Sequence, residues 1–233
     1  MAQYKTPDVY VQEKSLLAPS VAEVATAIPA FIGFTQITMD STGASVLNKP
    51  IRLSSLAEYQ AIFGFSQKEA FNVQYDADTD ECHVTSVEQG LAGATTPTYY
   101  LYQAVSHFYA NGGGACYVIS IGEHDITASP SDASKFMDAI DILQEVDEVT
   151  LISSPESALM DSVAHYSVQN HSLLHCEKMK DRFALVDVQQ VGGFTRGVLA
   201  ADAPAVRDQV ANGLQYGAAY YPYVRTTIAR SYD

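Results

Sequence analysis

A short stretch of the sequence carries four side chains of types that often bind metal ions. His171 and His175 are separated by one helical turn, Cys176 follows directly, and His165 lies shortly before them. On a helix, two histidines at this spacing lie on one face and can bind zinc together. Neither the glutamate of an HEXXH motif nor a closely spaced third ligand accompanies them. The pattern therefore favours a helix with hydrogen-bonded histidines, and we expect no metal site.

An acidic segment has the spacing of a calcium-binding loop at its start. Asp76, Asp78 and Asp80 occupy alternate positions, as the first three ligands of an EF-hand loop do. That loop also requires glycine at its sixth position and glutamate at its twelfth. Glu81 and Val87 occupy these positions here, so we expect a solvated acidic loop without a bound cation.

The glycines in the segment HFYANGGGACYVIS invite comparison with a phosphate-binding loop. Such a loop connects a strand to a helix, so that the helix N-terminus faces the anion. Here the order is reversed, because the glycines follow a predicted helix and precede a predicted strand. No Gly-Lys-Ser/Thr sequence follows them. The segment therefore predicts a helix end and a tight turn.

The carboxyl ends of the predicted strands are the remaining candidate location for a ligand-binding or active site. Polar residues lie there at 122–125, at 153–155 and at Asp187 and Gln189. A hydrolase would combine a serine, a histidine and an acid, but no Gly-x-Ser-x-Gly elbow surrounds Ser153. Ser154 is better explained as the cap of a helix with Pro155 at its first position. An α/β hydrolase-like enzyme stays an alternative, and we expect no catalytic residues and no cofactor.

Composition and charge restrict the classes of partner. The chain has 233 residues, of which 47% are hydrophobic and 17% charged, as is usual for a globular protein of one large or two small domains. Its net charge is −14, and its 13 lysines and arginines are scattered. Nucleic-acid interfaces need clustered cations, and anionic lipid repels acidic proteins. We therefore expect that the protein does not bind nucleic acid and does not insert directly into a membrane.

The cysteines and the N-terminus indicate the compartment. There are three cysteines and no CxxC motif, so a disulfide framework is not expected and a reducing cytoplasm is the simplest location. The first residues, MAQYKTPDVYVQEK, contain no apolar signal-peptide region. No apolar run reaches the ~20 residues needed to cross a bilayer.

Alternating strand and helix patterns predict an α/β fold with a mostly parallel or mixed sheet flanked by helices. The near-continuous apolar character of the strands indicates a sheet covered on both faces. Residues 1–20 are expected to form an extended N-terminal arm and residues 21–233 the core, within which 66–98 is expected to be an irregular insertion or surface loop. Strands are expected within 24–35, ending near Gly33, and at 116–121, 148–152, 182–188 and 218–224. Helices are expected at 55–63, around Leu101 to Phe108, around Phe136 to Leu143, from Pro155 to about Lys180 in one or two pieces, and around Val206 to Leu214.

The N-terminal arm is predicted to contain a strand without a local partner. Val9, Tyr10, Val11 and Gln12 alternate in type, and Pro7 precedes them. No second strand follows closely enough to form a hairpin, and a lone strand is marginal in water. This segment must therefore pair with a sheet elsewhere in its own domain or in another chain.

The arm also resembles the opening of contractile tail sheath proteins, which typically begin Tyr-x-Thr-Pro-Gly-Val-Tyr-Val-Glu-Glu. The corresponding segment here is YKTPDVYVQE at 4–13. Further segments resemble the sheath family, occur in the same order as in that family and span most of the chain. The N-terminal segment and the Asn-Gly-Gly turn are the most specific of them. The other similar segments are AFIGFT at 30–35, KPIRLSSLAEYQAIFG at 49–64, AVSHFYANGGGACYVISI at 104–121, DRFALVDV at 181–188 and GAAYYPYV at 217–224.

The resemblance implies a structural subunit of a phage tail or phage-tail-like contractile injection system. Its partners would be further copies of itself in stacked rings, an inner tube protein, and baseplate and terminal cap proteins. Assembly would occur in the cytoplasm, with release from the cell in some systems. The arm would add a strand to a neighbouring subunit's sheet, through the interface residues Tyr4, Thr6, Pro7, Val9, Tyr10, Val11 and Glu13.

Two features depart from the family pattern. Asp8 replaces the usual glycine, although aspartate tolerates left-handed backbone better than most residues. The family's chains usually continue beyond the segment similar to 217–224, so the C-terminal part of the family core and a second arm are expected to be absent. A baseplate or adaptor module that shares the sheath core is therefore a further alternative.

Overall fold

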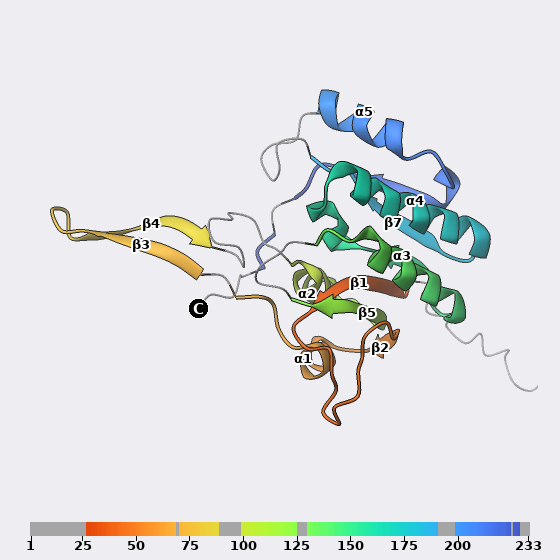
Figure 1. The fold of residues 1–233 in the computed structure, drawn as a ribbon, viewed down its shortest axis with the longest axis horizontal. Coiled ribbons are helices and arrows are strands. Elements are labelled where there is room, and N and C mark those ends of the chain that lie inside the picture. Colours follow the sequence, from red (N-terminus) through yellow and green to blue (C-terminus); the bar gives the residue numbers. More distant parts are fainter. Residues whose placement is uncertain are drawn as a thin grey trace, which may run out of the picture.

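The computed structural model describes residues 27–68, 70–88, 99–124, 130–190, 199–224 and 226–228. These residues form an α/β body with a hairpin that extends from one side (Figure 1). The predicted α/β class is confirmed. The N-terminal arm, 1–20, lies outside the described residues, so its extended conformation stays a prediction.

A mixed sheet of six strands forms the centre of the body, in the order β2-β5-β1-β6-β7-β8. Neighbouring strands are parallel except β2, which pairs antiparallel with β5 at one edge. Strand β1 is central because all seven residues of PAFIGFT are buried, as a strand covered on both faces requires. The strands are β1 (Pro29–Thr35), β2 (Ile51–Leu53), β5 (Cys116–Glu123), β6 (Leu151–Ser153), β7 (Phe183–Asp187) and β8 (Gly217–Tyr220).

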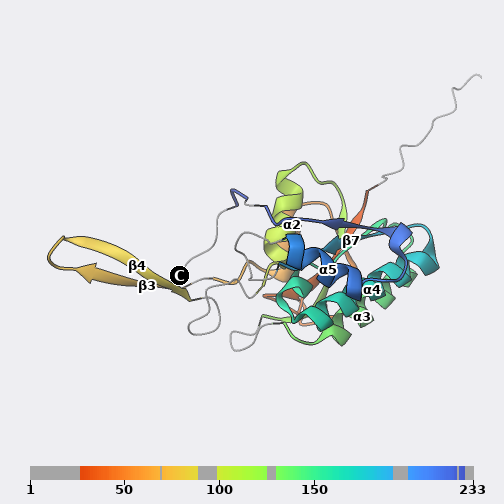
Figure 2. The ribbon, with the colours of Figure 1, turned by 90° about the horizontal axis from the view of Figure 1, so that it is seen from above.

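Helices cover both faces of this sheet, with α2 on one side and α3 and α4 on the other (Figure 2). Side chains alternate along β1, so Ala30, Ile32 and Phe34 pack under α3 and α4, whereas Phe31 packs with α1 and α2. The helices are α1 (Leu56–Phe63), α2 (Leu101–Ala110), α3 (Ala133–Ile142), α4 (Ser162–Met179) and α5 (Leu199–Gln209), with short 3-10 helices η1 (Leu143–Glu145), η2 (Pro155–Leu159) and η3 (Leu214–Tyr216).

Helix starts and ends follow the expected residues in most places. Ser55 caps α1 by accepting a hydrogen bond from Glu58 N, and Gly64 ends this helix with a φ of 81°. The predicted cap at Ser154 is wrong, because its side chain makes no capping bond. The helix predicted from Pro155 is divided into η2 and α4, since the Asp161 carboxylate caps α4 by accepting from Val163 N and Ala164 N.

Two other local predictions need correction. The last helix was expected to include Val210 and Leu214, but α5 ends at Gln209 and Leu214 begins η3. The segment 66–98 was expected to be irregular, but β3 (Ala70–Asp76) and β4 (Glu81–Glu88) form an antiparallel two-stranded sheet. Apolar and polar residues alternate in AFNVQYD, as a strand requires, but a register shift after Asn72 interrupts the pattern across the pair. Its status as an insertion stays a prediction.

Candidate functional site

The interface residues expected from the sequence lie in the N-terminal arm, outside the part of the chain that the structure describes. They are Tyr4, Thr6, Pro7, Val9, Tyr10, Val11 and Glu13. The described residues therefore show two other things that bear on function: the polar groups at the carboxyl edge of the sheet and the free edges of the sheet.

Glu156 is the central polar residue at the carboxyl edge, and the sequence analysis missed it. Its Oε2 atom accepts a hydrogen bond from Phe34 N at 2.7 Å, and its Oε1 atom accepts from Tyr100 N at 2.8 Å and Leu101 N at 2.9 Å. The residue is fully buried. A Cβ atom at Gly33 would lie 2.6 Å from Oε2, so glycine leaves the necessary room.

This carboxylate joins three elements that are distant in the sequence. Phe34 belongs to β1, Leu101 begins α2, and Glu156 itself lies in η2. The N-terminus of α2 favours negative charge, as helix N-termini do. Burial raises the pKa of Glu156 to about 7, whereas its three backbone N–H donors act in the opposite direction. Every oxygen of the carboxylate already has a donor, so the group acts as a structural clamp.

A serine and a histidine also meet at this edge, but they are closed to solvent. His165 Nδ1 lies 3.1 Å from Ser157 Oγ, and His165 Nε2 lies 3.0 Å from the main-chain oxygen of Asp187. A carbonyl oxygen only accepts, so Nε2 carries the proton of the neutral ring. The one proton of the Ser157 hydroxyl then lies between two acceptors, the main-chain oxygen of Ser154 at 2.7 Å and His165 Nδ1 at 3.1 Å. Burial lowers the pKa of His165, which favours this neutral form.

The Ser157–His165 pair differs from a hydrolytic site in two ways. In such a site a carboxylate orients the histidine, whereas Asp187 contributes its backbone carbonyl here. Ser157 and His165 are both fully buried, and Gln169 Nε2 also donates to Ser157 Oγ at 3.0 Å. This arrangement holds η2 against α4 and β7 and leaves no access for a substrate.

The other edge residues named from the sequence make separate structural contacts and form no common site among the described residues. Ser153 ends β6, and Ser154 is buried with an Oγ atom that has no hydrogen-bond partner within the described residues. Gln189 Nε2 donates to the main-chain oxygens of Ala158 and Met160. His124 stacks on Tyr99, and burial lowers its pKa to about 4. These contacts connect loops to the core.

The histidines of α4 are used in packing and hydrogen bonding. His171 Nε2 lies 2.9 Å from Asp141 Oδ1, whereas His175 is buried, and burial, followed by the charge of Arg182, lowers its pKa to about 4. Cys176 is buried next to them. Among the described residues, no three His, Cys, Asp or Glu side chains are grouped to hold a metal ion.

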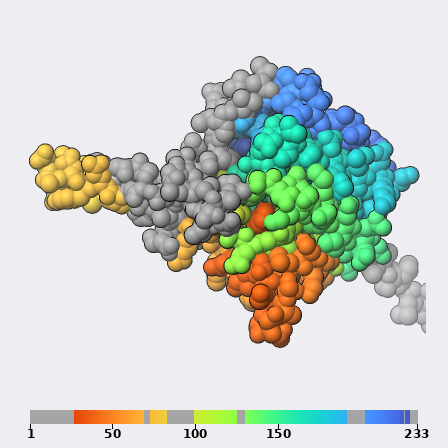
Figure 3. All heavy atoms as spheres, in the orientation of Figure 1, coloured from red at the N-terminus to blue at the C-terminus, as the bar shows by residue number. Residues whose placement is uncertain are grey.

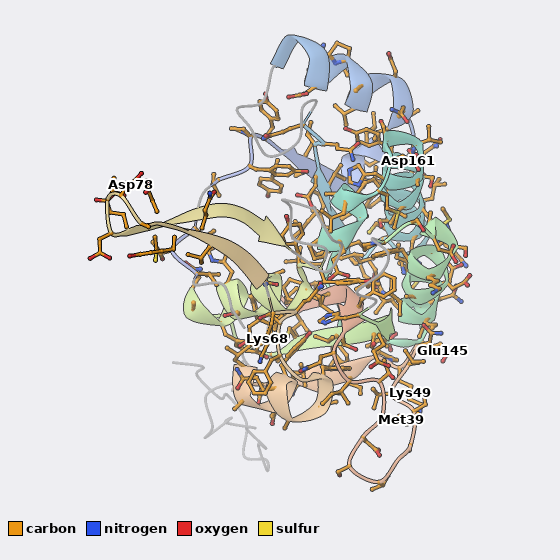
Figure 4. The ribbon with its side chains drawn as sticks, turned by 60° about the vertical axis from the view of Figure 1, so that its left-hand side comes forward. Met39, Lys49, Lys68, Asp78, Glu145 and Asp161 are labelled. Atoms are coloured by element: carbon orange, nitrogen blue, oxygen red, sulfur yellow. The ribbon has the colours of Figure 1, made fainter. Side chains whose placement is uncertain are left out.

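The predicted acidic loop is the turn of the β3–β4 hairpin. Asp76 Oδ1 accepts from Asp78 N at 2.9 Å, and Asp80 Oδ1 accepts from the Tyr75 hydroxyl at 2.8 Å. Asp78 lies at the far end of the hairpin (Figure 4). These hydrogen bonds shape the turn.

The sheet has free edges where another strand can pair. β8 is the last strand on one side, and no other described strand pairs with its outer edge. Tyr220 at its end is 59% exposed. An unpaired edge presents backbone N–H and C=O groups that can accept a strand from another chain. Nothing in the described part of the chain covers this edge with a further strand.

In comparisons with known proteins, no protein-family model matches the chain, and no curated protein matches it at a significant level. None of the described helices is both long enough and apolar enough to cross a bilayer.

Proposed function

We propose that this chain is a structural sheath subunit of a contractile, phage-tail-like injection apparatus. Copies of the chain polymerise as stacked rings around an inner tube protein, between baseplate and terminal cap proteins. Contraction of the sheath then drives the tube through a target envelope. The subunit carries out no chemical reaction.

The observation that carries the proposal is the ordered set of sheath-like segments. YKTPDVYVQE is the most specific of them. The other segments coincide with core elements of the fold, namely β1, β2 with α1, α2 with β5, β7 and β8. The likeness therefore covers the framework of the domain as well as its arm.

The free edge of β8 supports the proposal from the structure. The segment Tyr4–Glu13 needs a sheet with which to pair, and β8 offers an unpaired edge within the described residues. Each added backbone hydrogen bond contributes about 0.5–1.5 kcal/mol net. A short added strand is therefore a weak link alone, and repetition along a tube makes the assembly stable.

The alternative of an α/β hydrolase-like enzyme has less support. It would use the serine and histidine nearest the carboxyl edge, but Ser157 and His165 are fully buried and hydrogen-bonded to neighbouring groups. No specific observation favours the baseplate or adaptor alternative over the sheath.

The proposal predicts that the purified full chain forms rings or tubes by itself. Negative-stain electron microscopy should show regular polymers, and sedimentation velocity should show a rapidly sedimenting species whose fraction rises with concentration. A chain that stays monomeric at its highest soluble concentration would contradict the proposal.

A further inference from the structure

The β3–β4 hairpin has an exposed apolar side with no described partner. Val73 is 49% exposed and Tyr75 is 58% exposed. Residues two apart on a strand point to the same side, and Cys82, also exposed, stands directly opposite Tyr75 in the register. A two-stranded hairpin alone is marginal in water. This side therefore has the composition of a contact surface.

The hairpin is also strongly acidic. Residues 70–88 contain no lysine or arginine and include Asp76, Asp78, Asp80, Glu81 and Glu88. In the space-filling view its tip stands at one extreme of the molecule (Figure 3). A partner for this element must combine apolar surface with positive charge.

A pocket of about 310 Å³ on the body has these properties. It lies between α4, α5, η3 and the strands β7 and β8, and we call it the α5 pocket. Among the described residues that line it, Arg207 alone is charged, and Leu214 at its rim is 59% exposed. Leu173, Val186, Val206 and Val210 make most of its wall apolar. Its volume is within the ~300–1,000 Å³ range of sites that enclose small ligands.

The hairpin extends away from α4 and α5 in both ribbon views, so it does not reach the α5 pocket of its own chain (Figures 1 and 2). We infer that the hairpin of one copy docks in the α5 pocket of the next copy, with Val73 and Tyr75 against the apolar wall and the acidic turn near Arg207. The two surfaces are different patches of one chain. Such a head-to-tail contact builds rings or helical filaments, and the inference thus rests on the proposed polymer.

A disulfide cross-link between the two surfaces tests this contact. Cys82 is the exposed cysteine of the described residues, whereas Cys116 and Cys176 are buried. The full-length Leu214→Cys variant, mildly oxidised after assembly, should give a ladder of covalent multimers on a non-reducing gel. Met39→Cys is the matched control, because Met39 is 61% exposed on a different loop, and it should give no ladder. Adding Cys82→Ala to Leu214→Cys should abolish the ladder.

Charge reversal provides a second readout that does not depend on cysteine chemistry. Asp78→Arg and Arg207→Asp should each raise the concentration required for half-maximal assembly by about two- to fivefold, and the double variant should restore it. A faster-migrating cross-linked monomer would place the hairpin in its own pocket and overturn the inference. Absence of a ladder, or an equal ladder from the Met39→Cys control, would overturn it as well.

The outcomes separate this contact from the proposed function. If the wild-type chain forms regular polymers but the Leu214→Cys variant gives no ladder, the hairpin contact is wrong and the sheath proposal stands. If the wild-type chain forms no polymers, both the sheath proposal and the hairpin contact are wrong.

Discussion

Deletion of residues 1–14 should abolish polymers while leaving a folded monomer. The deletion removes Tyr4–Glu13, the segment that we propose to pair with a neighbouring subunit. It leaves the core intact, because the first described strand, β1, begins at Pro29. Ile28, just before it, is buried and donates its N–H to Thr150 Oγ1 at 2.9 Å. Electron microscopy and sedimentation velocity measure the loss of polymer, and circular dichroism measures the retained fold.

Proline substitution gives a matched control that keeps the arm at full length. Val11→Pro and Gln12→Pro each remove one backbone N–H and restrict the chain, whereas Val11→Ala and Gln12→Ala keep every backbone donor. Adjacent residues of a strand point their N–H groups to opposite edges, so if strand addition links the subunits, the proline variant at one of these two positions should weaken assembly far more than its alanine counterpart. Polymerisation that is unchanged by the deletion would show that the arm does not link subunits.

Removal of the Glu156 carboxylate should cause the largest loss of stability among single substitutions at the carboxyl edge. In Glu156→Ala, the backbone N–H groups of Phe34, Tyr100 and Leu101 lose their acceptor inside the protein. Each buried unsatisfied group costs about 1–3 kcal/mol. Because the surrounding structure can relax in part, we expect the free energy of unfolding to fall by about 3–5 kcal/mol in total. Urea denaturation followed by circular dichroism measures this change in the free energy of unfolding.

The Glu156→Gln variant distinguishes the contributions of the two carboxylate oxygens to stability. The amide keeps one acceptor oxygen for Tyr100 and Leu101 but places an N–H₂ group opposite Phe34 N, so we expect an intermediate loss of about 1–3 kcal/mol. Glu148→Gln is the surface control, because the Glu148 side chain is 54% exposed beside Arg52 and such pairs contribute about 0–1 kcal/mol. A Glu156→Ala variant as stable as the wild type would contradict the clamp.

The pH dependence of Glu156→Gln follows from the raised pKa of Glu156, about 7 in the folded protein. A carboxyl group whose folded pKa exceeds its unfolded value of about 4.3 binds more protons in the native state. Its stabilising contribution is therefore complete below the unfolded pKa and is lost as the pH rises through 7. The stability difference between wild type and Glu156→Gln should become smaller from pH 5 to pH 8.

The main strands and helices were predictable because burial determines their composition. PAFIGFT is apolar throughout since β1 is covered on both faces, and α1 has a serine at its start and a glycine at its end. The hairpin was not predicted, because the register shift places an extra residue in β4 and so interrupts the alternation of apolar and polar residues in ECHVTSVE.

The polar groups of the carboxyl edge were only partly predictable. Asp187 was named as a possible acid, but its backbone carbonyl is the group that contacts His165, and no sequence pattern distinguishes the two roles. Glu156 was missed because a glutamate after Ser-Ser-Pro also fits the first turn of a helix. Its position four residues after the end of the predicted strand 148–152 was the available signal. The three N–H groups that donate to Glu156 come from β1 and the start of α2, at least 55 residues away from it in the sequence. Only the fold brings these donors and the carboxylate together.

A cryo-electron microscopy map of the assembled polymer tests the central claim most directly. The proposal predicts that the segment Tyr4–Glu13 of each subunit lies as an added strand along the sheet edge of a different copy. A map in which this segment pairs with its own sheet and contacts no other copy would contradict the proposal.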